Sequence, residues 1–254
     1  MPPRFYVFQP LVAGQPLTLP AGPARHVQVL RLQPGAPLTL FNGAGGEWAA
    51  TVARIGRQEV EVVVGPHHAV ERELACGVTL AVGMPANERM DGLVEKATEL
   101  GVAAIQPLVC ERSVLRLSGE RAAKKMAHWQ GVAAAASEQS GRTRVPRIDA
   151  VRSLSDWLAH TAPQASGTAD PPIRFVLSLR GAQPLALVAC RPAASLVFLS
   201  GPEGGLTEAE EVAARSHGFL PISLGLRTLR ADTAPLAALA WLAADQRFGG
   251  SAPP

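Results

Sequence analysis

The stretch that decides the fold is SLVFLSGPEGGLTEAE, which runs from Ser195 to Glu210. An apolar run ends at Ser200, a glycine-rich turn follows, and Thr207 with Glu210 has the spacing of a helix capping box. This pattern predicts a buried strand, a tight turn and a helix, as found in parallel α/β sheets. Ligands of such sheets bind at the carboxyl ends of the strands, so the turn is a candidate binding loop.

The turn lacks the signatures of phosphate-binding loops. A P-loop requires GxxxxGK[ST] and a dinucleotide-binding loop requires GxGxxG, and neither pattern is present. Gly201, Gly204 and Gly205 can adopt positive φ angles and let a ligand approach the backbone. Glu203 would repel a phosphate, so the pattern favours a neutral or cationic ligand with amines and hydroxyls. S-adenosylmethionine fits that description; the alternative is a turn shaped only by strand-to-helix geometry.

A second stretch, ISLGLRTLRADTAPLAAL from Ile222 to Leu239, repeats this layout. A strand enters a loop and a helix follows, with Pro235 in the first turn of that helix. Leu224, Gly225 and Leu229 offer backbone groups and an apolar lining that could sandwich an adenine ring. The two strand-end loops are therefore expected to form two walls of one pocket.

The two parts of the chain have different patterns of predicted secondary structure. Residues 1–72 contain short strand patterns separated by turn formers, which predicts a small β-barrel. Strands are expected at 4–8, 16–19, 26–32, 37–43, 47–55 and 59–65, and the polar segment 66–74 forms the boundary. Residues 73–254 alternate between strand and helix patterns, which predicts a parallel α/β sheet. Strands are expected at 77–84, 102–110, 173–179, 195–200 and 220–224, helices at 89–101, 119–140, 153–160, 207–218 and 232–248, and a surface loop at 161–172.

The composition is that of a globular protein, with 47% hydrophobic and 18% charged residues and a net charge of +3. Its basic residues are nearly all arginine, which suits phosphate groups and base edges, although coding bias explains the same excess. Cys76, Cys110 and Cys190 show no metal-ligand or disulfide spacing. No signal-peptide core or membrane-length apolar run is visible. We therefore expect a metal-free cytoplasmic protein.

The joint motifs resemble a known family. GPEGG (201–205) followed by LGLRTLRADTA (224–234) is similar to the paired C-terminal motifs of the RsmE family of SPOUT methyltransferases. Supporting segments are PRFYV (3–7), EKATELGV (95–102), CERSV (110–114) and EQSGR (138–142), so the resemblance spans nearly the whole chain. The chain departs from the family at Asp232, usually a glutamate, and at Leu226, often a proline.

The resemblance implies a fold, an activity and partners. The family methylates N3 of a uridine in the decoding region of 16S ribosomal RNA, with S-adenosylmethionine as methyl donor. It implies a trefoil-knotted SPOUT domain with a parallel sheet at 73–254, preceded by a PUA-like RNA-binding β-barrel at 1–72. It further implies a homodimer that acts on 16S rRNA, with the small ribosomal subunit as the expected partner.

Methylation of N3 requires that the nitrogen lose its proton. A carboxylate could take the proton, or an arginine could stabilise the uracil anion, and the sequence leaves both routes open. Structural roles are the alternative in each case; Glu203, for example, could simply hold its loop by accepting backbone N–H bonds. The expected catalytic residues are Arg230, Glu138 and Arg112. Expected cofactor contacts are Leu199, Gly201, Pro202, Glu203, Gly204, Gly205, Leu224, Gly225, Leu229 and Arg230, and expected RNA contacts are Arg4, Arg25, Arg31, Arg112 and Arg142.

Two other functions are alternatives to methyl transfer. A noncatalytic RNA-binding module would use the barrel alone, but it has no need of both the glycine loop and the LRADTA segment. A nucleotide-dependent enzyme is disfavoured because the P-loop lysine and a metal-binding carboxylate cluster are missing. Calorimetry with S-adenosylmethionine distinguishes the RNA-binding module, which would not bind the cofactor, from the methyltransferase. Thermal shift with ATP against S-adenosylmethionine tests the nucleotide-dependent enzyme, because a ligand of the native state raises the apparent stability.

Overall fold

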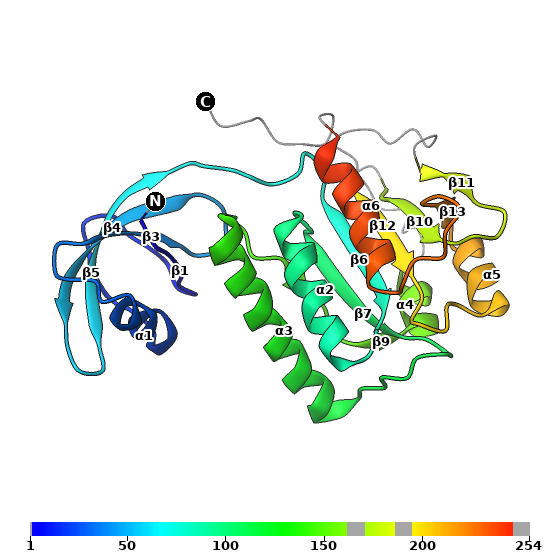
Figure 1. Cartoon of the computed structure of the whole chain (residues 1–254), viewed down its shortest axis with the longest axis horizontal. Helices are drawn as coiled ribbons and strands as arrows, with labels where there is room; N and C mark the ends of the chain where they lie inside the picture. Colours follow the sequence, from blue (N-terminus) through cyan, green and yellow to red (C-terminus); the bar gives the residue numbers. More distant parts are fainter. Residues whose placement is uncertain (1, 162–170, 186–194, 246–254) are drawn as a thin grey trace. The chain divides into compact units, whose positions relative to one another are not determined.

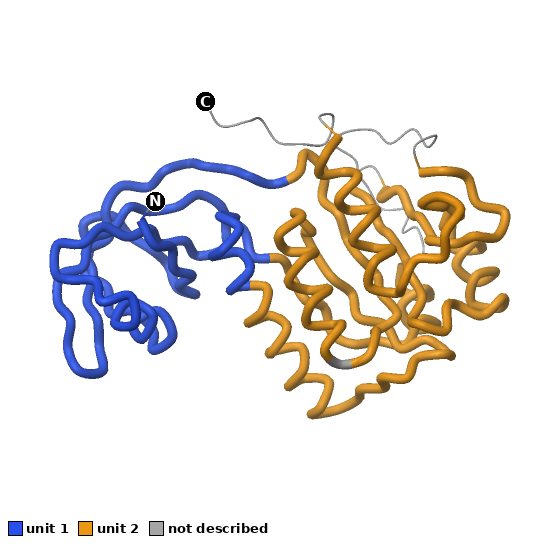
Figure 2. The backbone as a smooth tube through the Cα atoms, viewed as in Figure 1, with its two compact units in different colours: residues 1–73, 134–145 blue, residues 74–133, 146–254 orange. Residues whose placement is uncertain are grey.

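The computed structural model describes residues 2–161, 171–185 and 195–245. The chain forms two compact units, one of residues 1–73 and 134–145 and the other of residues 74–133 and 146–254 (Figure 2). The break after residue 73 lies one position from the predicted boundary. The segment 134–145, which the sequence assigns to the second domain, belongs to the first unit in the structure. The first unit is thus built from two distant pieces of sequence.

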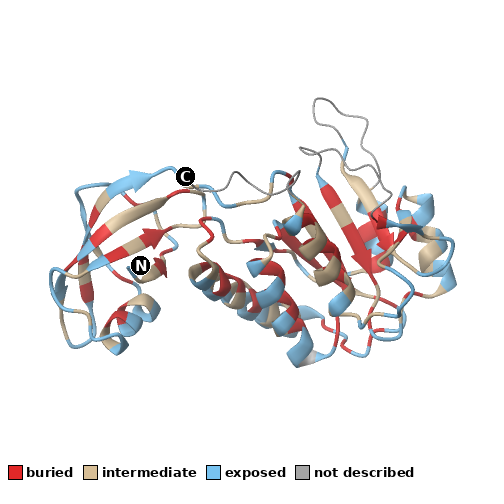
Figure 3. Cartoon of the chain, turned by 45° about the horizontal axis from the view of Figure 1, so that its top comes forward, coloured by how far each residue is buried: buried red, intermediate tan, exposed pale blue. Residues whose placement is uncertain are grey.

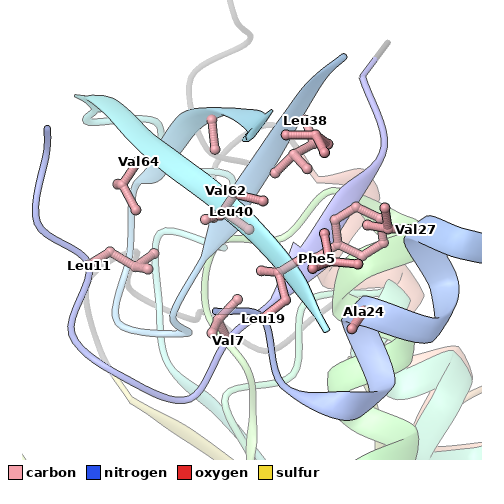
Figure 4. Close-up of a cluster of buried hydrophobic side chains, with 13 residues drawn as sticks. Phe5, Val7, Leu11, Leu19, Ala24, Val27, Leu38, Leu40, Val62 and Val64 are labelled. Atoms are coloured by element: carbon pink, nitrogen blue, oxygen red, sulfur yellow. The ribbon is translucent and has the colours of Figure 1, made fainter. Parts of the chain in front are cut away.

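The first unit contains a five-stranded sheet and the short helix α1 (Figure 1). Its strands lie in the order β1-β3-β4-β5-β2; β1 and β3 are parallel and the other pairs are antiparallel. Along β5, Val60, Val62 and Val64 are buried in alternation, as expected for a strand with one face on a core. Figure 4 shows this core. The elements are β1 (Arg4–Tyr6), β2 (Pro16–Thr18), α1 (Ala21–Val29), β3 (Pro37–Phe41), β4 (Glu47–Ile55) and β5 (Val60–His68).

One expected strand is wrong, because residues 26–32 lie largely within helix α1. The run HVQVLRL alternates like a strand, but Ala24 and Val27 are the buried residues of the helix, and a spacing of three places them on one helical face. Arg31 follows the helix with a φ of 54° and terminates it in the left-handed conformation. Strand β5 also runs on to His68, into the polar segment 66–74 in which the domain boundary is expected.

The second unit is a parallel sheet with helices on both faces (Figure 1). Its strand order is β11-β13-β10-β12-β6-β7-β8, and β9 also pairs with β7. Helix α3 begins in this unit, and its last residues belong to the first. The elements are β6 (Val78–Gly83), α2 (Asn87–Glu99), β7 (Ala104–Val109), α3 (Gly119–Ser140), β8 (Arg147–Ile148), β9 (Arg152–Ser153), α4 (Leu154–His160), β10 (Ile173–Leu177), β11 (Gln183–Pro184), β12 (Leu196–Ser200), α5 (Glu208–Ser216), β13 (Leu220–Ser223) and α6 (Thr233–Ala244).

The central strands of this unit are mostly apolar because they lie in its core. Strands β6, β7 and β12 are almost entirely buried, as Figure 3 shows by colour. Helices α4 and α5 pack together on one face over Ala81, Leu108 and Leu199. Helices α2 and α6 pack against each other on the other face. Most of the expected loop 161–172 and the end of the expected helix 232–248 lie outside the described residues.

The order of the strands brings three loops to one edge of the sheet. Strand β10 lies between β12 and β13, and all three run parallel. The loops that follow them therefore leave from the same carboxyl edge. A backbone hydrogen bond of 3.0 Å from Ser178 N to Ile222 O joins the ends of β10 and β13. This edge is where a ligand of an open α/β sheet binds.

Cys76 and Cys110 are buried, and Cys190 lies outside the described residues. Burial, assisted by the nearby charge of Glu210, raises the pKa of Cys110 to about 12. The Cys110 thiol is therefore protonated at neutral pH and is a poor nucleophile.

Candidate active-site pocket

A cavity of about 620 Å³ opens at the carboxyl edge of the second sheet. Its walls come from the loops after β10, β12 and β13, the same three loops that the strand order brings together. The rest of the lining is Arg89 from α2, Arg112 from the loop after β7, Glu211 from α5 and Ala234 from α6. The volume falls within the range of about 300–1,000 Å³ typical of small-molecule sites. The wall residues are 177–180, 200–206, 211, 222–224, 227–231 and 234.

Glycines in the 201–205 turn are required by close backbone approach. A Cβ added to Gly201 would lie 2.6 Å from the backbone N of Leu206 and 2.8 Å from the carbonyl carbon of Gly205. The same turn packs against the end of β6, where a Cβ on Gly83 would lie 2.5 Å from the ring of Pro202. Gly205 instead needs its φ of 68°, while space for a side chain is open. The turn is thus folded tightly on itself beside the cavity.

The negative charge within this turn has a structural partner. A carboxylate oxygen of Glu203 accepts the backbone N–H of Ala86 at 2.9 Å, immediately before helix α2. Ala86 is the N-cap residue of that helix and supplies no side-chain cap of its own. Arg89 Nη1 lies 3.9 Å from the same carboxylate oxygen. Glu203 therefore serves as a cap for α2 from across the sheet edge, favoured by the helix dipole.

Replacement of Glu203 by alanine is expected to lower the free energy of unfolding by about 1 kcal/mol, the usual cost of a lost cap. Glu203→Gln keeps an oxygen acceptor for the Ala86 N–H, so it is expected to lose only the charge, about 0.3–1 kcal/mol. Urea denaturation of both variants measures this difference. Equal losses in the two variants would show that the hydrogen bond to Ala86 contributes little.

Two further carboxylates on α5 fix the surrounding loops. Glu210 forms the predicted capping box with Thr207, and its other oxygen accepts the N–H of Glu111 at 2.8 Å. Glu211 accepts a hydrogen bond of 3.2 Å from the hydroxyl of Ser178 in the loop after β10. The Ser178 hydroxyl also accepts the N–H of Arg180 at 3.0 Å. Helix α5 thus holds the loops after β7 and β10 in place.

Most of the expected cofactor contacts line the cavity. Those that do are Gly201, Pro202, Glu203, Gly204, Gly205, Leu224, Leu229 and Arg230. Leu199 and Gly225 are outside the lining; Leu199 is buried in the core shared with α4 and α5. Of the expected catalytic residues, Arg230 and Arg112 line the cavity and Glu138 does not. Arg112 donates from Nη1 to the carbonyl of Gly204 at 3.0 Å, so it also supports the glycine turn.

Glu138 lies in the first unit, where its carboxylate accepts the backbone N–H of Tyr6 at 2.6 Å. Burial raises the pKa of Glu138 above that of a free carboxyl, and the hydrogen bond from Tyr6 with the charges of His26 and Arg4 opposes this rise only in part. The raised pKa means that the folded state binds the proton more tightly than the unfolded chain does. Ionised Glu138 therefore opposes folding at neutral pH.

The variant Glu138→Gln is accordingly expected to raise the free energy of unfolding at pH 7, by about 0.5–1 kcal/mol, because it keeps an acceptor without the buried charge. Wild-type stability is expected to rise as the pH falls through the raised folded pKa of Glu138 towards its unfolded value. The gap between variant and wild type should close over that interval. Urea denaturation between pH 4 and pH 8 measures it. A variant less stable than the wild type at pH 7 would contradict this account.

Two of the expected RNA contacts are held in ion pairs of the first unit. Arg142 is 4% exposed and its guanidinium pairs with Glu73. Arg4 pairs with Glu47, donates to the carbonyl of Arg142 at 2.9 Å and lies 5.0 Å from the ring centroid of Phe41. Arg4 thus joins strand β1 to the 134–145 segment, and Arg142 joins that segment to Glu73. The exposed residues Arg25 and Arg31 form no ion pair with any described residue.

Sequence reasoning missed several lining residues, above all the loop after β10. Ser178 and Arg180 lie at the end of an expected strand, 173–179, which the structure ends at Leu177, so the rule that ligands bind at strand ends could have found them. Ser200 is 3% exposed and its hydroxyl has no hydrogen-bond partner among the described residues, although it borders the cavity. One carboxylate oxygen of Asp232 is likewise buried without a described partner. These are polar atoms at or near the wall that a ligand could satisfy.

No helix in the described part of the chain is both long enough and apolar enough to cross a membrane. No set of three or more histidine, cysteine, aspartate or glutamate side chains in residues 2–161, 171–185 and 195–245 is arranged to hold a metal ion.

Comparisons with known proteins agree with this geometry. Residues 72–243 match the model of an RNA methyltransferase domain and residues 24–65 match that of an RNA methyltransferase PUA domain. The chain is 33% identical to ribosomal RNA small subunit methyltransferase E of Synechocystis over 88% of its own length and 71% of the relative's. It is 32% identical to that of Bacillus subtilis, with coverages of 84% and 83%.

Solved structures are similar over almost the whole chain. The enzyme of that name from Neisseria gonorrhoeae, crystallised with S-adenosylmethionine, is 37% identical with a TM-score of 0.87 and coverages of 96% and 97%. A methyltransferase from Legionella pneumophila in complex with the same cofactor is 33% identical with a TM-score of 0.87 and coverages of 96% and 98%. The sequence motifs, the parallel sheet and these matches agree. The chain belongs to the RsmE family of ribosomal RNA methyltransferases.

Proposed function

We propose that this protein transfers a methyl group from S-adenosylmethionine to N3 of a uridine in the decoding region of 16S ribosomal RNA. The observation that carries the proposal is the cavity at the sheet edge, walled by the glycine turn and by the 224–231 loop. Relatives of the same family that are solved with S-adenosylmethionine support the choice of cofactor. The choice of uridine N3 rests on the family.

The cavity fits S-adenosylmethionine in shape and chemistry. Gly201 leaves no room for a side chain, so the turn presents bare backbone to the cavity. Leu224 and Leu229 add apolar surface for an adenine, and the buried Ser200 hydroxyl has no partner among the described residues. The loop needs no phosphate-binding signature, because S-adenosylmethionine has no phosphate group. When bound, the cofactor supplies a methyl group on a sulfonium.

The chain's own residues must orient the uracil and favour its deprotonated form. Arg230 lines the cavity, is exposed, and is the side chain we assign to stabilising the negative charge of the uracil. Arg112 lines the cavity from the other side of the glycine turn and can share that role while it holds Gly204. Glu138 stays a candidate proton acceptor from the sequence. Its bond to Tyr6 gives it a structural role as well.

We further propose a homodimer and the family's trefoil knot in the second unit. Helix α6 has the sequence TAPLAALAWLAA, with a single polar residue, and a helix apolar on all sides is normally buried. Leu236 and Trp241 of this helix nevertheless remain partly exposed. A second copy packed on this face would cover them. Light scattering is expected to give twice the chain mass, and a monomer would refute the dimer.

The experiment that tests the function is methyl transfer from labelled S-adenosylmethionine to small ribosomal subunits from cells that lack the endogenous enzyme. Digestion and mass spectrometry should show N3-methyluridine at one position. A parallel reaction with naked 16S rRNA shows whether the assembled particle is needed.

No label on either substrate, with cofactor binding intact, would refute the proposed substrate. A folded dimer that binds RNA but no cofactor would indicate a binding module. Activity on ribosomal RNA would place the enzyme in the cytoplasm.

A further inference from the structure

The lining of the cavity is strongly basic. Five arginines border it, from α2 and from the loops after β7, β10 and β13, against the two carboxylates of Glu203 and Glu211. The formal charge of these cavity side chains is +3, which equals the net charge of the whole chain. The bound cofactor brings one carboxylate, but also an ammonium and a sulfonium. It does not need so many arginines.

The five arginines differ in how they are used within the protein. Arg89 faces Glu203, and Arg112 donates to the carbonyl of Gly204. Arg180, Arg227 and Arg230 are exposed, and none of their guanidinium groups has a hydrogen bond or ion pair with a described residue. Because Arg230 is assigned to the reacting base, Arg180 and Arg227 are two further cationic groups at the cavity without a partner.

Hydrogen bonds fix the backbone of Arg180 in place. Its N–H donates to the Ser178 hydroxyl at 3.0 Å, and its carbonyl accepts a hydrogen bond of 2.7 Å from Arg215 of α5. Arg215 in turn lies 3.7 Å from Glu211, which also binds Ser178. The backbone that carries Arg180 is thus fixed from α5, while its charged end is left free. Arg227 projects from the loop after β13, and β13 is the neighbour of β10.

Most arginines of the first unit are paired. Arg4, Arg72, Arg142 and Arg144 pair with Glu47, Glu73 or Glu71, and Arg54 pairs with Glu61. Arginines neutralised in this way have little charge left to offer to a polyanion. Arg25, Arg31 and Arg57 of that unit are exposed and have no ion pair with a described residue, but they do not line the cavity. The unpaired positive charge in the lining of the proposed reaction site therefore belongs to arginines of the second unit.

We propose that Arg180 and Arg227 bind phosphate groups of the RNA strand that carries the target uridine, at the mouth of the cavity. This proposal rests on the proposed function, since it takes RNA as the substrate. The planar guanidinium fork suits phosphate oxygens. Phosphate contacts fix the position and register of a nucleic acid and carry no sequence information. The two arginines would hold the strand while other groups recognise the base.

Phosphate contacts can be counted by the salt dependence of binding. For single strands, log K falls with log [salt] by about 0.7 for each phosphate neutralised, because counterions are released. The variants Arg180→Gln and Arg227→Gln are each expected to reduce the slope by about 0.7, and the double variant by about 1.4. The affinity of unmodified 16S rRNA for the full-length protein is measured by filter binding from 50 to 300 mM KCl, in the presence of S-adenosylhomocysteine.

The matched control is Arg152→Gln. Arg152 is exposed in the same unit, has no ion pair with a described residue and does not line the cavity, so the slope should be that of the wild type. Calorimetry with S-adenosylmethionine is run on every variant and is expected to give unchanged affinity. Weaker cofactor binding with an unchanged RNA slope would overturn the proposal and assign these arginines to the cofactor carboxylate.

Two outcomes separate this inference from the proposed function. A wild-type protein that methylates small subunits, with variants whose slope equals that of the wild type, would refute the phosphate contacts alone. A wild-type protein that binds cofactor but methylates neither subunits nor 16S rRNA would refute the proposed substrate. A slope reduced in the variants and unchanged in Arg152→Gln supports the assignment.

Discussion

The variant Gly201→Ala is expected to bind S-adenosylmethionine at least about 100-fold more weakly than the wild type, since displacements of about 1 Å at a site can have such effects. The new methyl group would lie 2.6 Å from the backbone N of Leu206 and 2.8 Å from the carbonyl carbon of Gly205. Both are backbone atoms, so no side-chain rotation relieves the overlap. The turn must open, and the surface that it offers to the cofactor changes with it. Isothermal titration calorimetry measures the loss.

Gly205→Ala is the matched control for this prediction. Its φ of 68° strains an alanine by about 1–2 kcal/mol, but nothing lies within 4 Å of the added Cβ. The turn can keep its shape, so cofactor affinity should fall far less than in Gly201→Ala. Circular dichroism establishes that both variants are folded. Normal affinity in Gly201→Ala would mean that the cofactor does not depend on this turn.

The variant Arg230→Gln is expected to lower kcat on the order of 10²–10³-fold, the usual loss when one donor to a developing anion is removed. Because Arg230 is exposed and its guanidinium group has no partner among the described residues, stability should change by less than about 0.5 kcal/mol. Cofactor affinity should change little as well. Single-turnover methyl transfer at saturating RNA isolates the chemical step from binding.

Arg112→Gln provides the comparison for Arg230. Its guanidinium donates to the carbonyl of Gly204, so its loss should weaken cofactor binding together with turnover. A kcat in Arg230→Gln close to that of the wild type would remove Arg230 from the chemistry. Loss of turnover in Glu138→Gln, with stability raised as predicted, would instead identify the carboxylate as the proton acceptor.

The sequence predicted the second unit well because its signals are local. The capping box of Thr207 and Glu210, and helix α3 from Gly119 to Ser140, both lie where the pattern placed them. The prediction of a cofactor site rests on glycines and strand ends, which are also local signals, and eight of its ten expected contacts line the cavity. Helix α1 was missed because HVQVLRL fits either period, and packing of Ala24 and Val27 decides between them. Tertiary contacts override such short alternations.

Long-range pairing is what the sequence could not supply. Nothing near Glu203 in the chain indicates that it accepts the N–H of Ala86, which is 117 positions away. Arg142 lies in a motif that contains candidate site residues, yet its guanidinium forms an ion pair with Glu73. Arg180 follows no glycine motif and becomes visible only when β10 is placed between β12 and β13. Partners of charged side chains are set by topology, which a single sequence does not reveal.

The split composition of the first unit has a consequence for its synthesis on the ribosome. The N–H of Tyr6 in β1 binds Glu138, which is 132 positions later. The unit is complete only when residue 145 has been added, roughly 70 residues after its main part ends at residue 73. At roughly 5–20 residues per second, that interval lasts on the order of 4–14 s. The nascent amino-terminal sheet therefore waits for its last segment while residues 74–133 of the second unit are translated.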